Sequence, residues 1–155
     1  MVPYWLSRMQ LLLDEETLIK LSTKHVLVVG LGGVGGICAE MIARAGIGKM
    51  TIVDADTVDL SNCNRQIPAL HSTAGKPKAA VMGQRLKDIN PNLELVVLEE
   101  YIQESRITEL LSSTHFDYAV DCIDTLSPKV FFIKNCVDLA IPIVSSFGAG
   151  GKLDP

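Results

Sequence analysis

A glycine-rich run at residues 30–36 is the part of this sequence best suited to chemistry. It reads Gly30-Leu31-Gly32-Gly33-Val34-Gly35-Gly36 and follows the spacing G-x-G-x-x-G. Glycines at this spacing permit a tight turn and let backbone N–H groups approach a phosphate closely. Asp54 follows at the distance where an acid usually holds ribose hydroxyls. The run therefore predicts a nucleotide site, and by itself it leaves NAD, FAD and ATP open.

A second set of polar side chains favours ATP. Its members are Asn62, Arg65, Gln66, Lys78, Asp121 and Asp124. An ATP-cleaving site must neutralise a triphosphate and hold a metal, so it needs several cations and a carboxylate directed at one place. Each residue alone has a simpler interpretation: Arg65 or Lys78 as a solvated surface charge, Asp124 as a helix cap. Their joint placement at one edge of the predicted sheet favours chemistry, with Mg²⁺ bound by a carboxylate.

The elements that must position these side chains alternate between strands and helices. Apolar runs predict strands at residues 25–30, 50–54, 93–98, 118–121 and 141–145. Helices are predicted at 34–45, 76–89, 105–111 and from Ser127, with Ser127 as cap and Pro128 in the first turn. This alternation predicts an α/β fold, a Rossmann-like parallel sheet covered by helices on both faces, with an N-terminal helix. Ligands bind beyond the carboxyl ends of such strands, where the candidate residues fall.

Composition limits the remaining possibilities. The 155 residues are 48% apolar, which excludes a disordered chain and predicts one domain over residues 1–155. There is no run apolar enough to span a membrane and no secretory signal, so we expect a cytoplasmic protein. The net charge of -4 gives no sign of a nucleic-acid binder. The four cysteines form no C-x-x-C pair and are expected to be reduced thiols; they are Cys38, Cys63, Cys122 and Cys136.

Taken together, these motifs closely resemble the ubiquitin-activating-like adenylyltransferase superfamily, which includes enzymes that activate thiamine and molybdopterin sulfur carriers. The resemblance runs from Arg8 to the last residue, and its motifs are Gly30 to Gly35, Asp54-Ala55-Asp56, Ser61-Asn62-Cys63-Asn64-Arg65-Gln66, Gly75-Lys76-Pro77-Lys78, Ile89-Asn90-Pro91 and Asp121-Cys122-Ile123-Asp124. Within the superfamily the sequence is most similar to the tRNA threonylcarbamoyladenosine dehydratase branch. The branch markers lie at residues 44–48, 69–73, 124–129 and 148–155.

The resemblance implies binding of ATP and Mg²⁺ and attack of a substrate carboxylate on the α-phosphate. In the dehydratase branch the carboxylate belongs to the threonyl group on a tRNA adenosine, and the adenylate is captured by the carbamoyl group with net loss of water. The alternative within the superfamily is adenylation of the C-terminus of a ubiquitin-like sulfur carrier. An NAD-dependent oxidoreductase, resting only on the glycine run and Asp54, and a non-catalytic dimeric binding module also stay open.

Roles are assigned by position from the same resemblance. The implied catalytic residues are Arg8, Arg65, Lys78 and Asp124, with Asp124 also positioning Mg²⁺. The implied nucleotide-binding residues are Gly30, Gly32, Gly33, Gly35, Asp54, Asp56, Ser61, Asn62, Arg65, Lys78, Asp124 and Thr125. Arg8 matches an arginine that in relatives reaches the ATP of the partner subunit, which implies a homodimer. A guanidinium supplied in this way can neutralise charge on the phosphates.

Departures from the family pattern refine this interpretation. Thr125 stands where members that activate sulfur carriers usually have Asn, which favours the dehydratase branch. The zinc cysteine pairs and thiol-bearing crossover of some relatives belong to a region beyond residue 155. The family continues past this point with more sheet. We therefore expect residues 1–155 to be the N-terminal portion of a longer enzyme, ending before its sheet is complete and retaining nucleotide affinity without full activity.

Overall fold

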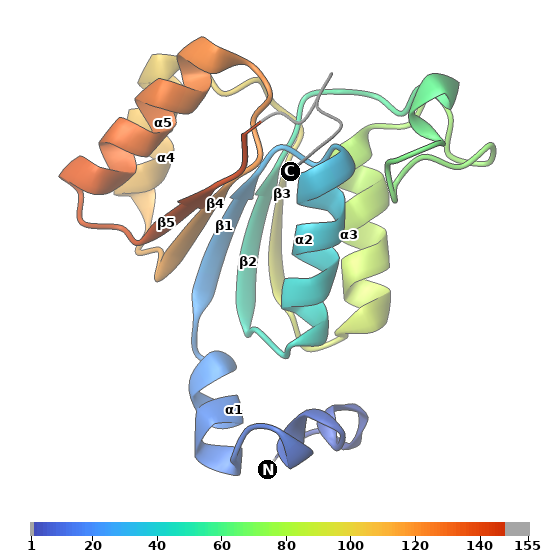
Figure 1. Ribbon diagram of the computed structural model, residues 1–155, viewed down its shortest axis with the longest axis vertical. Helices are drawn as coiled ribbons and strands as arrows, with labels where there is room; N and C mark the ends of the chain where they lie inside the picture. Colours follow the sequence, from blue (N-terminus) through green and yellow to red (C-terminus); the bar gives the residue numbers. More distant parts are fainter. Residues whose placement is uncertain (1, 148–155) are drawn as a thin grey trace.

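Five parallel strands form the centre of the computed structural model, which describes residues 2–147 (Figure 1). The strands are β1 (His25–Val29), β2 (Lys49–Val53), β3 (Glu94–Leu98), β4 (Tyr118–Asp121) and β5 (Ile143–Ser145). Their order in the sheet is β3-β2-β1-β4-β5, and every neighbouring pair is parallel. The predicted Rossmann-like α/β fold is confirmed. The order changes direction between β1 and β4, which is where such sheets bind ligands.

Helices cover both faces of the sheet (Figure 1). Helices α2 (Gly33–Arg44) and α3 (Lys78–Ile89) pack on one face, and α4 (Glu104–Ser113) and α5 (Leu126–Asp138) on the other. Val28 of β1 belongs to the apolar core under α2 and α3, whereas its neighbours Leu27 and Val29 belong to the core under α4 and α5. Successive side chains of a strand point to opposite faces, so burial on both faces requires the continuous apolar run seen in β1.

Element boundaries differ from the prediction mainly beside prolines. Helix α3 begins at Lys78, with Pro77 as its N-cap rather than in its first turn. The N-cap of α5 is Thr125, so the prediction that Ser127 caps this helix is wrong, while Pro128 lies in the first turn as predicted. Strand β5 begins two residues later than predicted, because the Ile141 N–H donates to the Cys136 carbonyl of α5 and Pro142 has no N–H to donate.

The N-terminal segment carries the expected helix and lies beyond the ends where the strands begin (Figure 1). It contains the short 3-10 turns η1 (Tyr4–Leu6) and η2 (Met9–Leu11), then α1 (Glu15–Leu21), whose N-cap Asp14 accepts a hydrogen bond from the Thr17 N–H. Within residues 2–147, no helix is long and apolar enough to cross a membrane. The branch marker at 148–155 and the expected end of the sheet lie outside the described residues.

Candidate nucleotide-binding site

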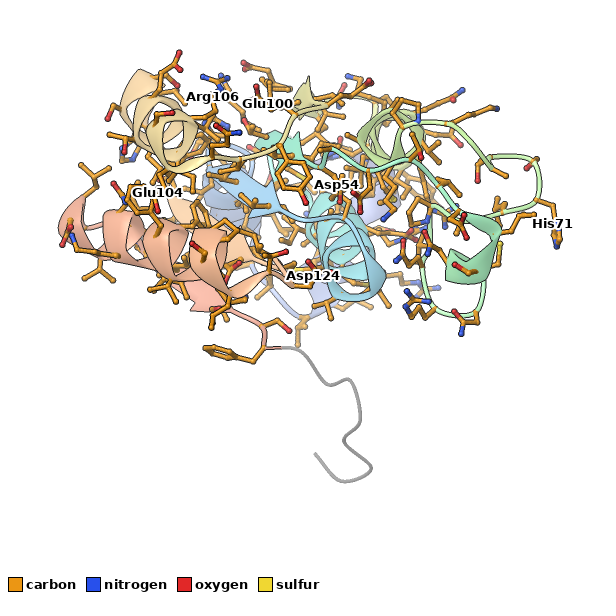
Figure 2. The ribbon with its side chains drawn as sticks, turned by 90° about the horizontal axis from the view of Figure 1, so that it is seen from above. Asp54, His71, Glu100, Glu104, Arg106 and Asp124 are labelled. Carbon is orange, nitrogen blue, oxygen red and sulfur yellow. The ribbon has the colours of Figure 1, made fainter. Side chains whose placement is uncertain are left out.

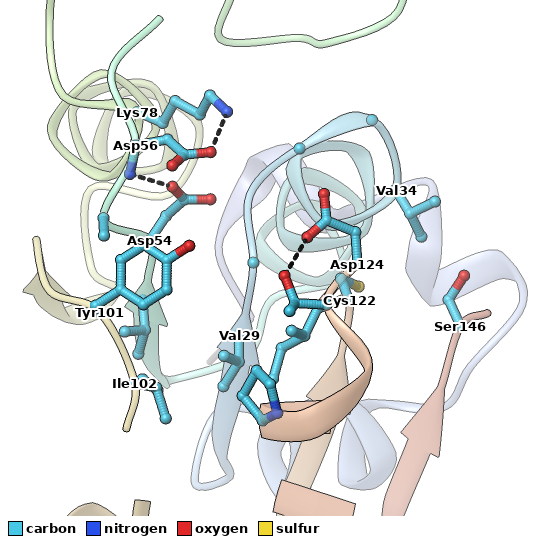
Figure 3. Close-up of a pocket in the computed structure, with 18 of the residues that line it drawn as sticks. Val29, Val34, Asp54, Asp56, Lys78, Tyr101, Ile102, Cys122, Asp124 and Ser146 are labelled. Atoms are coloured by element: carbon cyan, nitrogen blue, oxygen red, sulfur yellow. Dashed lines mark hydrogen bonds and ion pairs between the residues drawn. The ribbon is translucent and has the colours of Figure 1, made fainter. Parts of the chain in front are cut away.

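A cavity of about 550 Å³ opens at the carboxyl ends of the strands. That volume is typical of sites for small-molecule ligands. Segments that follow all five strands line it, and Figure 3 shows Asp54, Asp56 and Lys78 on one side with Cys122 and Asp124 on the other. The sequence-predicted residues that line the cavity are Gly30, Gly32, Gly33, Asp54, Asp56, Arg65, Gln66, Lys78, Asp124 and Thr125. The parallel sheet therefore brings most of the candidate residues together beyond the ends of its strands, where such sheets bind ligands.

The glycine loop joins β1 to α2 and lines this cavity. Gly30 has a φ of +88°, and a Cβ there would lie 2.6 Å from the carbonyl oxygen of Cys122. A Cβ at Gly35 would lie 1.7 Å from the carbonyl oxygen of Gly30, because the first turn of α2 packs directly on the end of β1. Gly32 and Gly33, the N-cap and first residue of α2, line the cavity. The positive end of the helix dipole thus faces the cavity and favours an anion.

Asp54 connects the end of β2 to the glycine loop. Its Oδ2 accepts a hydrogen bond from the Leu31 N–H at 2.6 Å, and its Oδ1 accepts one from the Asp56 N–H at 2.8 Å. Burial raises the pKa of the Asp54 carboxyl, while these two hydrogen bonds and the Lys78 cation act in the lowering direction. Each carboxylate oxygen has a second lone pair, so Asp54 can accept ligand hydroxyls as well.

Two cations line the cavity, Lys78 and Arg65. The Nζ of Lys78 lies 2.9 Å from Oδ2 of Asp56, and only 7% of the Lys78 side chain is exposed. Arg65 lies in the loop between β2 and α3, where its guanidinium donates to the Ser61 carbonyl at 3.1 Å and to Asn64 Oδ1 at 2.9 Å. These contacts hold two positive charges near the glycine loop, where they can neutralise an anionic ligand.

The opposite side of the cavity presents a carboxylate. Asp124 follows β4 and is exposed, with its Oδ1 accepting a hydrogen bond from the Thr125 hydroxyl at 3.2 Å. The described residues include no cluster of three or more His, Cys, Asp or Glu side chains that could hold a metal by itself. Mg²⁺ that arrives with a nucleotide needs only one or two carboxylates besides phosphate oxygens and water. The donor set at Asp124 therefore fits nucleotide-borne Mg²⁺.

Four predicted residues lie outside the cavity lining. Gly35 faces Gly30 in the packing contact described above. Ser61 and Asn62 belong to the turn η3 (Leu60–Asn62), where Asn62 Oδ1 accepts from the Asp59 N–H and the Ser61 carbonyl accepts from Arg65. These two residues therefore shape the loop that carries Arg65. Arg8 is the N-cap of η2, in the segment beyond the opposite ends of the strands.

Asp121 was also predicted from the sequence as a possible metal-binding carboxylate, but it lies outside the cavity. Its side chain is fully buried and lies 2.6 Å from Nζ of Lys129, which is itself buried. Asp121 does not line the cavity. A carboxylate already neutralised by a buried ammonium is not available to a metal ion.

Several residues of the cavity carry no motif and were not predicted. Glu100, Tyr101 and Ile102 follow β3 and line the cavity, and Figure 3 shows Tyr101 next to Asp54. Glu100 accepts a hydrogen bond from Arg106 of α4 at 2.9 Å, and Figure 2 shows these two residues close together. Their position directly after a predicted strand was the available signal.

Gln66, one of the polar candidates named from the sequence, lines the cavity, and so does Cys122. The Oε1 atom of Gln66 is buried and has no hydrogen-bond partner among the described residues, so it can accept a hydrogen bond from a ligand. Burial raises the pKa of the Cys122 thiol to about 12. The thiol is therefore protonated at neutral pH and is a poor nucleophile.

A parallel sheet of this order, with a glycine loop, an acid after β2 and a cavity lined by two cations and Asp124, defines a Rossmann-like nucleotide-binding fold. The ThiF family matches residues 6–152, and the chain belongs to this family. The predicted superfamily membership is thereby confirmed.

Several individual proteins are similar to this chain over most of its length. The chain is 41% identical over 149 residues to the tRNA threonylcarbamoyladenosine dehydratase of Bacillus subtilis, covering 96% of this chain and 58% of that protein. It matches the crystal structure of the E. coli dehydratase TcdA in complex with ATP with a TM-score of 0.91 and 38% identity, covering 96% of this chain and 60% of that one. The E. coli sulfur carrier protein ThiS adenylyltransferase is 34% identical over 149 residues, 93% of this chain and 59% of that protein. The chain thus spans about three fifths of the length of these relatives.

Proposed function

We propose that this chain is the ATP-binding part of an enzyme that adenylates the threonyl carboxylate of threonylcarbamoyladenosine in tRNA and so drives its cyclising dehydration. The observation that carries the proposal is the opposition of Lys78 to Asp124 across a cavity that the glycine loop and Arg65 also line. A dinucleotide needs few charges beyond a glycine loop and a ribose acid, whereas this arrangement suits a metal-bound triphosphate. The identity to dehydratases supports the choice of substrate.

The charged residues and the glycine loop of the cavity then have the following tasks. The N-terminus of α2 binds phosphate oxygens through backbone N–H groups, and Lys78 and Arg65 neutralise phosphate charge. Asp54 accepts ribose hydroxyls, and Asp124 holds the Mg²⁺ that accompanies the nucleotide. Bound ATP supplies the adenylyl group that turns a carboxylate into an electrophile.

The charge balance of the cavity calls for further cations. Its lining holds four carboxylates, Asp54, Asp56, Glu100 and Asp124, and two cations, Arg65 and Lys78. A triphosphate and a substrate carboxylate add more negative charge to this place. Mg²⁺ is one source of compensation, and a cation from outside the lining is a second.

Arg8 is our candidate for that second cation. It is exposed, and its segment lies beyond the ends where the strands begin, away from the cavity of its own chain (Figure 1). We propose a homodimer in which Arg8 of a second copy reaches the phosphates, as the family resemblance implies. A tRNA substrate also suits a cytoplasmic protein, and its contacts must come from a local basic surface, the dimer or further chain, since the net charge is -4.

The decisive experiment is ATP–pyrophosphate exchange by the full-length protein. We expect modified tRNA to stimulate exchange and a carrier protein with a Gly-Gly tail to have no effect. Stimulation by the carrier alone would replace the tRNA substrate with a sulfur carrier, the alternative to which the 34% identity to ThiS adenylyltransferase points. Binding of a nicotinamide cofactor without binding of ATP would refute adenylation altogether.

A further inference from the structure

We infer that Lys129 is a positioning residue for the metal-bound nucleotide, because its ion pair with Asp121 closes the loop that carries Asp124. The inference rests on the proposed function. Asp121 is the last residue of β4, and Lys129 lies in the first turns of α5. The residues between them, 122–125 and the start of α5, form one side of the cavity.

The ammonium group of Lys129 is fully engaged inside the protein. Its Nζ lies 2.6 Å from Oδ2 of Asp121, 2.8 Å from the Ser146 carbonyl oxygen and 3.4 Å from the Ser145 hydroxyl. The Lys129 side chain is 4% exposed. An ammonium group has three protons, so each has an acceptor and the side chain is fixed in one position.

The carboxylate of Asp121 holds the loop after β4 and the end of β5, in addition to Lys129. Its Oδ1 accepts a hydrogen bond from the Ile123 N–H at 3.0 Å, which fixes the first turn of the loop after β4. Its Oδ2 also accepts from the hydroxyl of Ser145, the residue that stands opposite Asp121 in the β4–β5 register. One carboxylate therefore joins the loop after β4, the end of β5 and the first turns of α5.

Asp124 depends on this frame for its position. It is exposed, and its side chain receives a hydrogen bond from the adjacent Thr125, which belongs to the same loop. The placement of its carboxylate is therefore set by the backbone of residues 122–125. That backbone is held by Asp121 at one end and by Lys129 at the other.

Stability alone does not account for such a pair. Burying two charges carries a desolvation penalty that can exceed their attraction, and apolar pairs of similar size are often as stabilising. Fixed geometry is the property that this pair provides and an apolar pair would not. The same helix carries an ion pair of equal length between Lys134 and Asp138, both more than half exposed, which does not touch the cavity.

The test uses the double variant Asp121→Asn/Lys129→Met, because Lys129→Met alone leaves a buried carboxylate unpaired and can fail to fold. The matched control is Lys134→Met on the same helix. The measured quantity is the ratio of the ATP Kd in EDTA to the ATP Kd in Mg²⁺, obtained by calorimetry. Partners that orient a metal ligand typically contribute 10–100-fold to metal affinity, so we expect this ratio to fall about tenfold in the double variant and to stay unchanged in the control.

A second measurement needs no ligand. In the nucleotide-free protein, amide hydrogen exchange at Ile123 should be faster in the double variant and unchanged in Lys134→Met. Ser145→Ala, which keeps the ion pair and removes one hydrogen bond to Asp121, should produce smaller changes in both readouts. If the double variant does not fold, both measurements are made on Ser145→Ala instead.

The outcomes separate the two proposals. A folded double variant, or failing that Ser145→Ala, with the wild-type ratio and wild-type exchange at Ile123 would overturn the positioning role and leave the proposed function intact. A wild-type protein whose ATP affinity does not respond to Mg²⁺ would overturn the proposed use of Asp124 and the positioning role together.

Discussion

Oδ2 of Asp54 accepts a hydrogen bond from the Leu31 N–H at 2.6 Å, so the acid at the end of β2 is bound to the glycine loop itself. Its other oxygen accepts from the Asp56 N–H. The acid that follows a glycine loop at this spacing is usually explained by ribose binding alone. In this chain it also fixes the loop relative to β2, because Leu31 lies between Gly30 and Gly32.

Replacement of Asp54 should therefore affect stability and nucleotide binding together. In Asp54→Ala two backbone N–H groups lose their acceptor, and we expect a loss of about 1–3 kcal/mol in the free energy of unfolding and at least tenfold in ATP affinity. Asp54→Asn keeps one acceptor and should lose less stability. Urea unfolding and calorimetric titration measure the two effects. Asp117→Ala is the control, since Asp117 also accepts from a backbone N–H, that of His25, but lies outside the cavity. Equal ATP affinity in both Ala variants would contradict the expectation.

Substitution of two glycines of the loop should distinguish a packing role, at Gly35, from a role in phosphate binding, at Gly33. In Gly35→Ala the Cβ would lie 1.7 Å from the Gly30 carbonyl oxygen, so α2 must move away from β1. We expect a loss of about 3 kcal/mol or more in the free energy of unfolding. In Gly33→Ala the nearest atom would be 3.6 Å away, so the fold should be retained, while ATP affinity falls because the methyl group blocks close approach of phosphate. Thermal unfolding and ATP titration distinguish the two; a Gly33→Ala protein with wild-type affinity would refute backbone binding of phosphate.

The contrast between predicted and unpredicted residues has a physical cause. The strands were predictable because a strand buried on both faces needs a continuous apolar run, which β1 has from Val26 to Val29. The glycine loop, Asp54 and Lys78 were predictable because each follows from a motif with a known spacing. A lysine such as Lys129, near the start of a helix, has the same local pattern whether it is solvated or buried. Its burial depends on the register of β4 with β5, which brings Ser145 beside Asp121, and no local pattern encodes that register.

The boundary of α5 and the residues that follow β3 were also not predictable from local sequence. Thr125 rather than Ser127 precedes α5 as its N-cap, since the boundary is set by where the loop after β4 ends and not by the Ser-Pro pair. Glu100 and Tyr101 enter the cavity because β3 is adjacent to β2 in the sheet, which their own residue types do not indicate.

His25 should make the stability of the protein sensitive to pH. Its Nδ1 lies 3.0 Å from the His115 carbonyl oxygen and its Nε2 2.9 Å from the Thr51 hydroxyl, so the neutral ring can donate to the first and accept from the second. Burial lowers the pKa of His25 below its usual value of 6.5. In the unfolded chain the ring binds a proton near pH 6.5, and in the folded protein it binds one only at lower pH. The contribution of the neutral His25 ring to stability is therefore fully present above about pH 6.5 and is lost as the pH falls below that value.

Urea unfolding between about pH 7.5 and 5.5 tests this expectation, because most carboxylates titrate below that range. The wild-type free energy of unfolding should decrease across the range, and His25→Gln should flatten the decrease. His71→Asn serves as the control, since His71 is exposed at the tip of the loop before α3 (Figure 2). A control variant as flat as His25→Gln would assign the pH dependence to another group.

The four cysteines should react with thiol reagents in an order set by burial. Cys63 is exposed, whereas burial raises the pKa of Cys122 and of Cys136 to about 12. We expect one rapidly modified thiol in the native protein, at Cys63, and modification of Cys122 and Cys136 only on unfolding. Peptide mass spectrometry after timed labelling with iodoacetamide locates the modified sites. Cys63→Ser should remove the fast phase; rapid labelling of Cys122 would contradict the protonated thiol inferred at the cavity.

Arg8 provides the sharpest test of a shared active site. In a dimer where Arg8 of one copy serves the cavity of the other, Arg8→Ala and Arg65→Ala each inactivate both sites of their own homodimer in the full-length enzyme. A mixed dimer then contains one cavity that has Arg65 from its own chain and Arg8 from the second copy. After subunit exchange at equal concentrations, half of the dimers are mixed, so about a quarter of the wild-type exchange activity should return. A mixture that stays inactive after subunit exchange has been demonstrated by mass spectrometry would place Arg8 in its own chain's site or outside the reaction.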